Sequence, residues 1–189
     1  MLWRNPMALK EWAVVVWALG QGRQILLLRK GGVAEEEGEF RLAASEFFLY
    51  PTYEHQQAEL LQPQFAEKFP AVAADSPSAG ELWFRLYAVV TDVLPAPSLD
   101  RMKQLSDSFV WNDPFLEKRY AYRPELPLHV LLVRTYALSE PLRVPERPRY
   151  AGCRSWVELE ESLPTAGASP VLRDEEFDRR REALMLRLQ

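Results

Sequence analysis

Residues 8–32 constrain the fold more than any other part of this chain. The segment starts with an apolar stretch of helix length, turns at the glycines of 20–22, and ends in the apolar run 25–28. Its first half has apolar or small residues at helical spacing, namely Leu9, Trp12, Ala13, Val16 and Gly20. We therefore predict a helix that is capped by Asn5, has Pro6 in its first turn and ends near Leu19. A buried strand over 24–30 follows, and the rest of the chain must cover both elements.

Later patterns add strands and helices in mixed order. Strands are predicted at 47–50, 83–94 and 129–138. Helices are predicted at 53–61 with Thr52 as the cap, at 99–105 with Ser98 as the cap, and at 174–188. Together these elements predict an α+β fold, a small mixed β-barrel or curved sheet with flanking helices and a C-terminal helix.

The length of 189 residues fits one domain. We interpret residues 1–163 as a single α+β domain and the small-residue stretch 164–173 as a linker. Residues 174–189 form the C-terminal helix, with acidic residues first and arginines later, as the helix dipole favours. That helix has a thin apolar face, and it either docks on the domain or serves a protein partner.

Composition places the chain among soluble globular proteins. Hydrophobic residues make up 48% of the chain, and no apolar run approaches the roughly 20 residues of a membrane span. The only cysteine, Cys153, excludes an internal disulfide and a cysteine-rich zinc site and fits a reducing cytoplasm. We expect a cytoplasmic protein with no membrane contact, in which Cys153 is a small buried residue.

Charge is distributed unevenly along the sequence. Residues 1–30 hold five basic and one acidic side chain, whereas residues 31–81 hold two basic and ten acidic ones. The acidic loop Glu35–Glu39 is interpreted as a solvated turn, the alternative being a cation site. The net charge of −4 argues against coating nucleic acid by charge alone, but a local basic face remains compatible with it.

A search for catalytic patterns is negative. Two histidines and no G-x-S-x-G make a nucleophilic triad a weak hypothesis, and no cluster of residues has metal-ligand spacing. None of the five lysines follows an acidic residue at the two-residue spacing of restriction-type nucleases, and no phosphate-binding glycine loop is present. We predict no metal and no cofactor. If the chain is an enzyme, His55 would act as acid or base, with Glu11 or Glu54 assisting.

A group of aromatic and polar residues lies outside clear core periodicity. Its members are Tyr53, Trp111, Phe115, Trp156, His55, Gln56, Asn112 and Arg119. Such a mixture suits a pocket that stacks a planar ring and hydrogen-bonds its edge, and it suits ordinary core equally well. His55 and Gln56 would lie in the first turn of the predicted second helix, where free amides attract anions. An exposed histidine with no partner is the alternative.

Several motifs resemble those of a known bacterial family. They are ALKEWAVVVWALGQGRQILLLRKGG at 8–32, EF at 39–40, FFLYPTYEHQ at 47–56 and AGCRSW at 151–156. They are similar to the family catalogued as domain of unknown function 1802, over about residues 6–163. Relatives fused to a restriction-endonuclease-like domain imply work beside restriction–modification systems, although we expect no such fusion in this chain.

The order of elements also resembles, by layout alone, the PUA-like group that contains the ASCH and EVE domains. That resemblance implies a small barrel that binds RNA or modified bases. On this basis the pocket and its phosphate-facing rim would comprise Lys10, Arg29, Lys30, Tyr53, His55, Gln56 and Trp111.

Three hypotheses follow from the sequence. The first is a nucleic-acid-binding module, including one for a modified base, in which Arg29 and Lys30 face phosphate. The second is an enzyme that acts on a nucleotide or nucleic acid through His55. The third is a scaffold that recruits a protein partner through its C-terminal helix.

Overall fold

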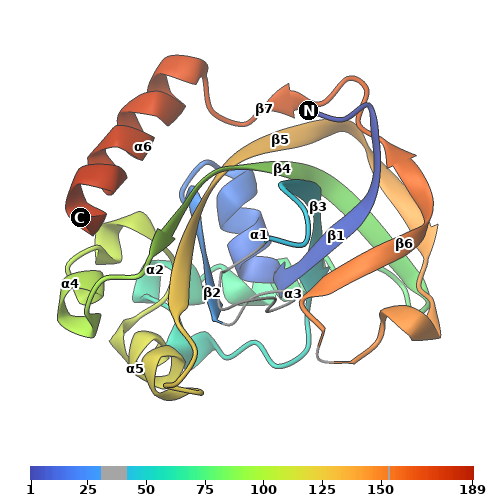
Figure 1. Ribbon diagram of the computed structural model, residues 1–189. Helices are drawn as coiled ribbons and strands as arrows, with labels where there is room; N and C mark the ends of the chain where they lie inside the picture. Colours follow the sequence, from blue (N-terminus) through green and yellow to red (C-terminus); the bar gives the residue numbers. More distant parts are fainter. Residues whose placement is uncertain (31–41, 153) are drawn as a thin grey trace.

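The computed structural model describes residues 1–30, 42–152 and 154–189. Within them the strands form one mixed sheet in the order β2-β5-β4-β3-β1-β6, with β7 paired to β5. The strands are β1 Arg4–Trp12, β2 Leu26–Lys30, β3 Glu46–Thr52, β4 Glu81–Pro95, β5 Leu128–Pro145, β6 Trp156–Pro164 and β7 Ser169–Pro170. The pair β1 and β3 is parallel and the other pairs are antiparallel. The predicted α+β class with a curved mixed sheet is confirmed (Figure 1).

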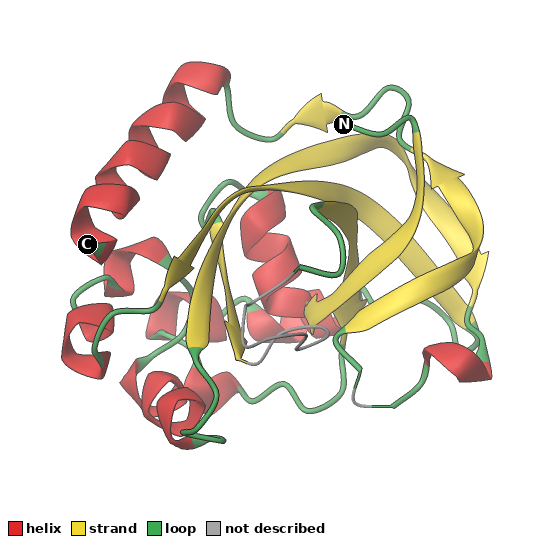
Figure 2. Cartoon of the chain, in the orientation of Figure 1, coloured by secondary structure: helices red, strands yellow, loops and turns green. Residues whose placement is uncertain are grey.

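Helices fill the curve of the sheet and gather along one side of it (Figure 2). The α-helices are α1 Ala13–Gly20, α2 Pro63–Ala66, α3 Phe69–Ala74, α4 Leu99–Lys103, α5 Asp113–Ala121 and α6 Asp174–Leu188. Short 3-10 turns are η1 Ala58–Leu60, η2 Ser106–Ser108 and η3 Pro148–Tyr150. The acidic loop Glu35–Glu39 and Cys153, for which the sequence predicts a turn and a buried residue, lie outside the described residues. No helix in the described ranges has the length and apolar character to cross a membrane.

The helix predicted from Asn5 is wrong over its first half. Residues 4–12 form β1, and the helix begins only at Ala13. The side chain of Asn5 caps no helix: it donates to Glu46 O and Tyr87 Oη, both at 2.7 Å, and accepts from Met7 N at 2.8 Å. The register of β1 against β6 shifts between Asn5 and Met7, so Pro6 lies at an irregularity where a missing N–H is tolerated.

The helix predicted at 53–61 is also wrong. Strand β3 continues to Thr52, whose hydroxyl donates to Glu11 O at 3.1 Å instead of capping a helix. A turn follows in which His55 has a φ of 62°, a left-handed conformation that a helix cannot contain. Only the 3-10 turn η1 lies within the predicted helix. His55 and Gln56 therefore leave the strand in a tight turn and not in a helical first turn.

Other local signals are confirmed. Ser98 accepts from Arg101 N at 3.4 Å and caps α4, as predicted. Strands β4 and β5 are longer than expected and pair along most of their length, with register shifts between Phe84 and Leu86 and between Val90 and Asp92. Such irregularities bend a strand pair, which contributes to the curvature of this sheet.

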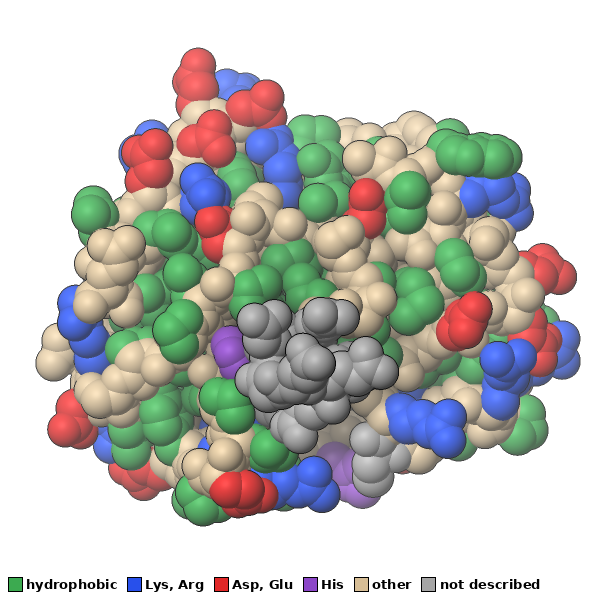
Figure 3. All heavy atoms as spheres, in the orientation of Figure 1, with side chains coloured by type: hydrophobic (Ala, Val, Ile, Leu, Met, Phe, Trp, Pro, Cys, Tyr) green, Lys and Arg blue, Asp and Glu red, His purple; other side chains and the backbone are tan. Residues whose placement is uncertain are grey.

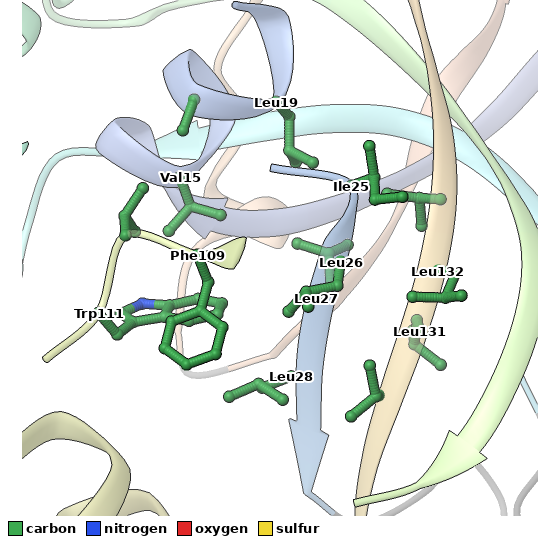
Figure 4. Packing of buried hydrophobic residues seen from close by; sticks show 14 of the residues in the cluster. Val15, Leu19, Ile25, Leu26, Leu27, Leu28, Phe109, Trp111, Leu131 and Leu132 are labelled. Carbon is green, nitrogen blue, oxygen red and sulfur yellow. The ribbon is translucent and has the colours of Figure 1, made fainter. Parts of the chain in front are cut away.

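The main core lies between α1 and the concave face of the sheet. Figure 4 shows Val15 and Leu19 of α1 facing Ile25 and the β2 residues 26–28, with Phe109 and Trp111 packed beside them. A second cluster, which includes Phe48, fills the other face between β3, β4 and β6. Because β2 and β3 are covered on both faces, their buried residues follow one another without alternation, at 26–28 and 47–50.

The C-terminal helix α6 has the predicted bounds and is docked on the domain. Its apolar residues Phe177, Leu184 and Leu188 belong to the main core cluster. Arg181 forms a two-point ion pair with Asp92 of β4. The segment expected to be a linker lies along the sheet, where β7 pairs with β5. The apolar face of α6 is therefore occupied by its own domain, which leaves it no free apolar stripe for a partner.

We predict that Leu184→Ala lowers the free energy of unfolding by about 2–5 kcal/mol, because it opens a cavity under α6. Leu186→Ala on the same helix is the matched control, since Leu186 is 74% exposed and Leu184 only 5%. The control should stay within about 0.5 kcal/mol of the parent in urea unfolding. Equal effects for the two variants would contradict the docking of α6.

The Asp92–Arg181 pair should make stability depend on pH. Hydrogen bonding from Arg181 is the main cause that lowers the pKa of Asp92 below its ordinary value. A carboxylate with a lowered folded-state pKa stabilises the fold above its unfolded value of about 3.9 and loses that contribution as pH falls. Arg181→Gln should therefore destabilise the protein at pH 7, and the deficit should shrink in urea unfolding at pH 3. A deficit of constant size would show that the pair acts through packing alone.

Candidate functional site

The parallel strands β1 and β3 end side by side, and a hollow lies at their carboxyl ends. The register joins Lys10 to Tyr50 and Trp12 to Thr52, so that the residues that follow both strands meet at one edge. We call this hollow the β1–β3 cleft; its volume is about 540 Å³, within the usual range of small-ligand sites. It is lined by Lys10, Trp12, 50–55, 76–79, 81–83, Glu146, Ala151, Gly152, Arg154 and Ser155.

Aromatic rings supply much of the wall of the cleft. Trp12, Tyr50, Tyr53 and Trp83 all line it. The ring of Trp12 is held edge-on against Phe115 at a centroid distance of 5.3 Å. Burial, followed by the charge of Asp75, raises the pKa of Tyr53, so its phenol stays neutral and remains a hydrogen-bond donor. The cleft therefore offers fixed planar surfaces for a planar ligand.

Polar groups fix the floor of the cleft. The hydroxyl of Tyr50 donates to Glu146 Oε1 at 3.2 Å, and burial followed by that carboxylate raises the pKa of Tyr50 well above its ordinary value. Lys10 Nζ lies 5.4 Å from the centre of the Tyr50 ring and donates to the carbonyl oxygens of Tyr150 and Gly152. Lys10 thus ties the turn before β6 to β1 and β3.

The charges in the cleft are mixed. Glu54, Glu81 and Glu146 bring three carboxylates, whereas Lys10 and Arg154 bring two cations and His55 an imidazole. Within the described part of the chain, the Arg154 guanidinium has no hydrogen-bond or ion-pair partner. Figure 3 shows Lys and Arg interspersed with Asp and Glu on the right of the view, where β6 lies in Figure 1. The visible face is therefore no broad cationic surface, and recognition there must be local.

The structure brings three of the predicted site residues together, because Lys10, Tyr53 and His55 all line the β1–β3 cleft. His55 reaches the cleft from the left-handed turn after β3 and is exposed. The hypothesis that Trp111 shares this cleft is wrong. Trp111 is 2% exposed, lies in the main core and stacks on Phe115 with centroids 5.0 Å apart and planes 6° apart. A side chain so enclosed cannot stack on a ligand.

Arg29, Lys30 and Gln56 also lie outside the cleft and make internal contacts. Arg29 forms an ion pair with Glu11 at 2.9 Å and donates to Lys10 O at 3.1 Å. Lys30 Nζ donates to the carbonyl oxygens of Tyr120 at 2.7 Å and Arg119 at 3.2 Å.

Gln56 Oε1 accepts from Val14 N at 3.1 Å, at the start of α1. These three side chains hold the fold together, so the expected phosphate role of Arg29 and Lys30 is not supported by their contacts. Glu11 is likewise occupied by Arg29 and by its hydrogen bond from Trp12 N at 2.8 Å.

Sequence reasoning misses Trp12, Trp83 and Glu146. The predicted helix stripe includes Trp12, and Trp83 opens a strand whose neighbours are core residues. Glu146 is the one acidic residue within the basic run 143–154, and that contrast is a usable signal. The described residues contain no group of three metal-ligating side chains.

These features define an α+β domain with a curved mixed sheet and an aromatic, mixed-charge cleft at the ends of two parallel strands. The chain belongs to the family described as "Domain of unknown function (DUF1802)", whose model matches residues 8–183. Among curated proteins, none matches.

Two solved structures from Zymomonas mobilis are similar in fold. The ASCH protein is 10% identical, with a TM-score of 0.43 and 93% of each chain covered. A point mutant of the same ASCH protein is 9% identical, with a TM-score of 0.43, covering 97% of this chain and 99% of the other. Both carry the name of the group whose layout the sequence resembles.

We predict that Trp111→Ala lowers the free energy of unfolding by about 3–5 kcal/mol, because the ring is core. His55→Gly should stay within about 1 kcal/mol of the parent or exceed it, since glycine adopts a φ of 62° without strain. Urea unfolding of both variants measures the contrast. If Trp111→Ala were as stable as the parent, the ring would not be core, and Trp111 would again be a candidate for contact with a ligand.

Proposed function

We propose that this chain is a nucleic-acid-binding module that receives a base, including a modified one, in the β1–β3 cleft. The observation that carries the proposal is the convergence of Lys10, Tyr53 and His55 with two tryptophans in one hollow of about 540 Å³. The restriction–modification or nucleic-acid-metabolism setting that the family resemblance implies is part of the same proposal.

Stacking supplies the affinity in this proposal. A base enters against Tyr53 and the tryptophan rings, each of which is anchored by its strand or by a neighbouring ring. Base–aromatic stacking contributes about 1–3 kcal/mol per base and tolerates any base, because every base has a π-face. Aromatic walls alone would therefore bind every base and give no base specificity.

Edge contacts supply the choice of base. The carboxylates Glu54 and Glu81 can accept from exocyclic amino groups, as acidic residues do from cytosine N4. His55 and Arg154 can donate to ring nitrogens or carbonyl oxygens. Because carboxylates outnumber the lysine and arginine cations, the cleft favours the base over its phosphate. The cleft therefore selects a ring that carries amino groups.

An enzyme is the second candidate function, and the contacts in the cleft indicate which residues would form its acid–base pair. Glu54 and His55 both line the cleft, whereas Glu11 is buried and paired with Arg29. Any acid–base chemistry would therefore use His55 with Glu54, and not with Glu11. Turnover of nucleotides or short oligonucleotides that disappears in His55→Gly would favour this candidate over pure binding.

We predict that Tyr53→Ala weakens binding of short oligonucleotides by about 5- to 150-fold, which corresponds to about 1–3 kcal/mol of stacking free energy. The measurement is titration of the tryptophan fluorescence with oligonucleotides of each base, confirmed by calorimetry. Tyr122→Ala is the matched control, because Tyr122 is 53% exposed and does not line the cleft.

The control should bind like the parent, and both variants should unfold at nearly the parental urea concentration. Unchanged binding in Tyr53→Ala, or an equal decrease in Tyr122→Ala, would remove the cleft from consideration as the base site. The preference for bases with amino groups should weaken in Glu81→Gln if edge contacts make the choice.

A further inference from the structure

Two further hollows extend from the β1–β3 cleft, the first next to it and the second next to the first. The first, called here the apolar hollow, has a volume of about 410 Å³ and is walled by Val16, Trp17, Val72 and Leu86, among others. The second, called the basic hollow, has a volume of about 630 Å³ and lies between α1, α2 and α6. Its charged lining residues are Arg23, Lys68, Arg180, Arg187 and Asp107.

Shared side chains join the three hollows in a row. Pro51, Tyr53 and Trp83 line both the β1–β3 cleft and the apolar hollow. Trp17 and Lys68 line both the apolar hollow and the basic hollow. An aromatic ring therefore stands at each boundary, so that a ligand leaving one hollow meets a planar surface before it enters the next.

Neighbouring side chains fix the rings at these boundaries. Trp83 lies beneath the guanidinium groups of Arg85 and Arg143, at 5.3 Å and 4.8 Å from its ring centre. Trp17 packs edge-on against Phe65 of α2 at a centroid distance of 6.5 Å. Rings that are already fixed lose little entropy when a ligand stacks on them.

Two of the cations in the basic hollow are free for a ligand. Arg187 is paired with Asp107, and Arg180 is paired with Glu176 and donates to Gly22 O. Within the described part of the chain, neither the guanidinium of Arg23 nor the ammonium of Lys68 has a hydrogen-bond or ion-pair partner. Positive charge therefore collects at the end of the row that lies away from the three cleft carboxylates.

The order of aromatic rings and cations along the three hollows matches one kind of polymer. Planar surfaces at intervals with a cationic end suit a chain that repeats rings and phosphates, and both must be reachable at once. In a duplex the ring faces are already stacked inside, so the strand must be single. An acidic peptide would use the cations but leave the tryptophan platforms without planar partners.

We propose that the three hollows form one groove for single-stranded nucleic acid, with one base in the β1–β3 cleft and the phosphate backbone directed past Trp17 to Lys68 and Arg23. The inference rests on the proposed function, because it uses the same base site. It adds the partner, a single strand several nucleotides long, and a direction along the groove.

The test compares ligand length. The parent protein should bind a pentanucleotide, as RNA or DNA, at least about 10-fold more tightly than the mononucleotide of the preferred base. A duplex of the same sequence should not show this gain. In the double variant Arg23→Glu with Lys68→Glu the gain should disappear while mononucleotide binding stays parental. The slope of log affinity against log salt should also fall by about 0.7 for each phosphate that the variant no longer neutralises.

Arg173→Glu with Lys118→Glu is the matched control, because both residues are exposed and line none of the three hollows. It should keep the full gain with length, and urea unfolding should confirm that both double variants fold. A gain for RNA alone or DNA alone would support the groove and identify the sugar.

Mononucleotide binding that depends on Tyr53 but shows no gain with length would overturn the groove and leave the proposed function standing. Absence of binding to every nucleotide and oligonucleotide would overturn both. An equal decrease in the two charge variants, or tighter binding of an acidic peptide than of the single strand, would also overturn the groove.

Discussion

The parallel pairing of β1 with β3 is the constraint on which the rest of the structure depends. It places Lys10 beside Tyr50 and opens the cleft where both strands end. Side chains secure it at both ends: Asn5 bridges to the backbone of β3 through Glu46 O, and the Thr52 hydroxyl holds Glu11 O. A parallel pair needs a crossover between its strands, and α1 with β2 lies in that connection. The fold and the candidate site therefore have a common origin.

The sequence predicts the elements whose signals are local and fails where tertiary pairing decides. Helix α6 has the predicted bounds, and Ser98 caps α4 as expected, because caps and dipole charges act within one turn. The helix prediction for residues 4–12 is wrong because Leu9 and Trp12 continue the helical spacing of the true helix, whereas pairing with β3 and β6 makes this stretch a strand. The Asn5-Pro6 pair strengthens that error, although it serves a strand irregularity here.

The candidate site is predicted in part for the same reason. Lys10, Tyr53 and His55, three of the seven residues in the hypothesis, line one cleft, but they reach it through a strand end and a left-handed turn instead of a helix start. Composition cannot separate Trp111 from core, and its stacking on Phe115 shows that it is core. Arg29 and Lys30 resemble a basic rim in the sequence, yet their partners are a carboxylate and backbone carbonyls that no local pattern reveals.

Arg29 and Lys30 make internal contacts, so the basic excess of residues 1–30 does not by itself indicate a phosphate-binding surface. This positive charge serves largely to hold β2 against β1 and α5, and Arg23 is the member that stays exposed at a hollow. A net charge of −4 gives the molecule as a whole no long-range attraction to phosphate. Any polyanion must therefore be recognised through a few cations beside fixed aromatic rings. The proposed groove would discriminate by shape and stacking, and it would stay selective at salt concentrations that screen a purely cationic face.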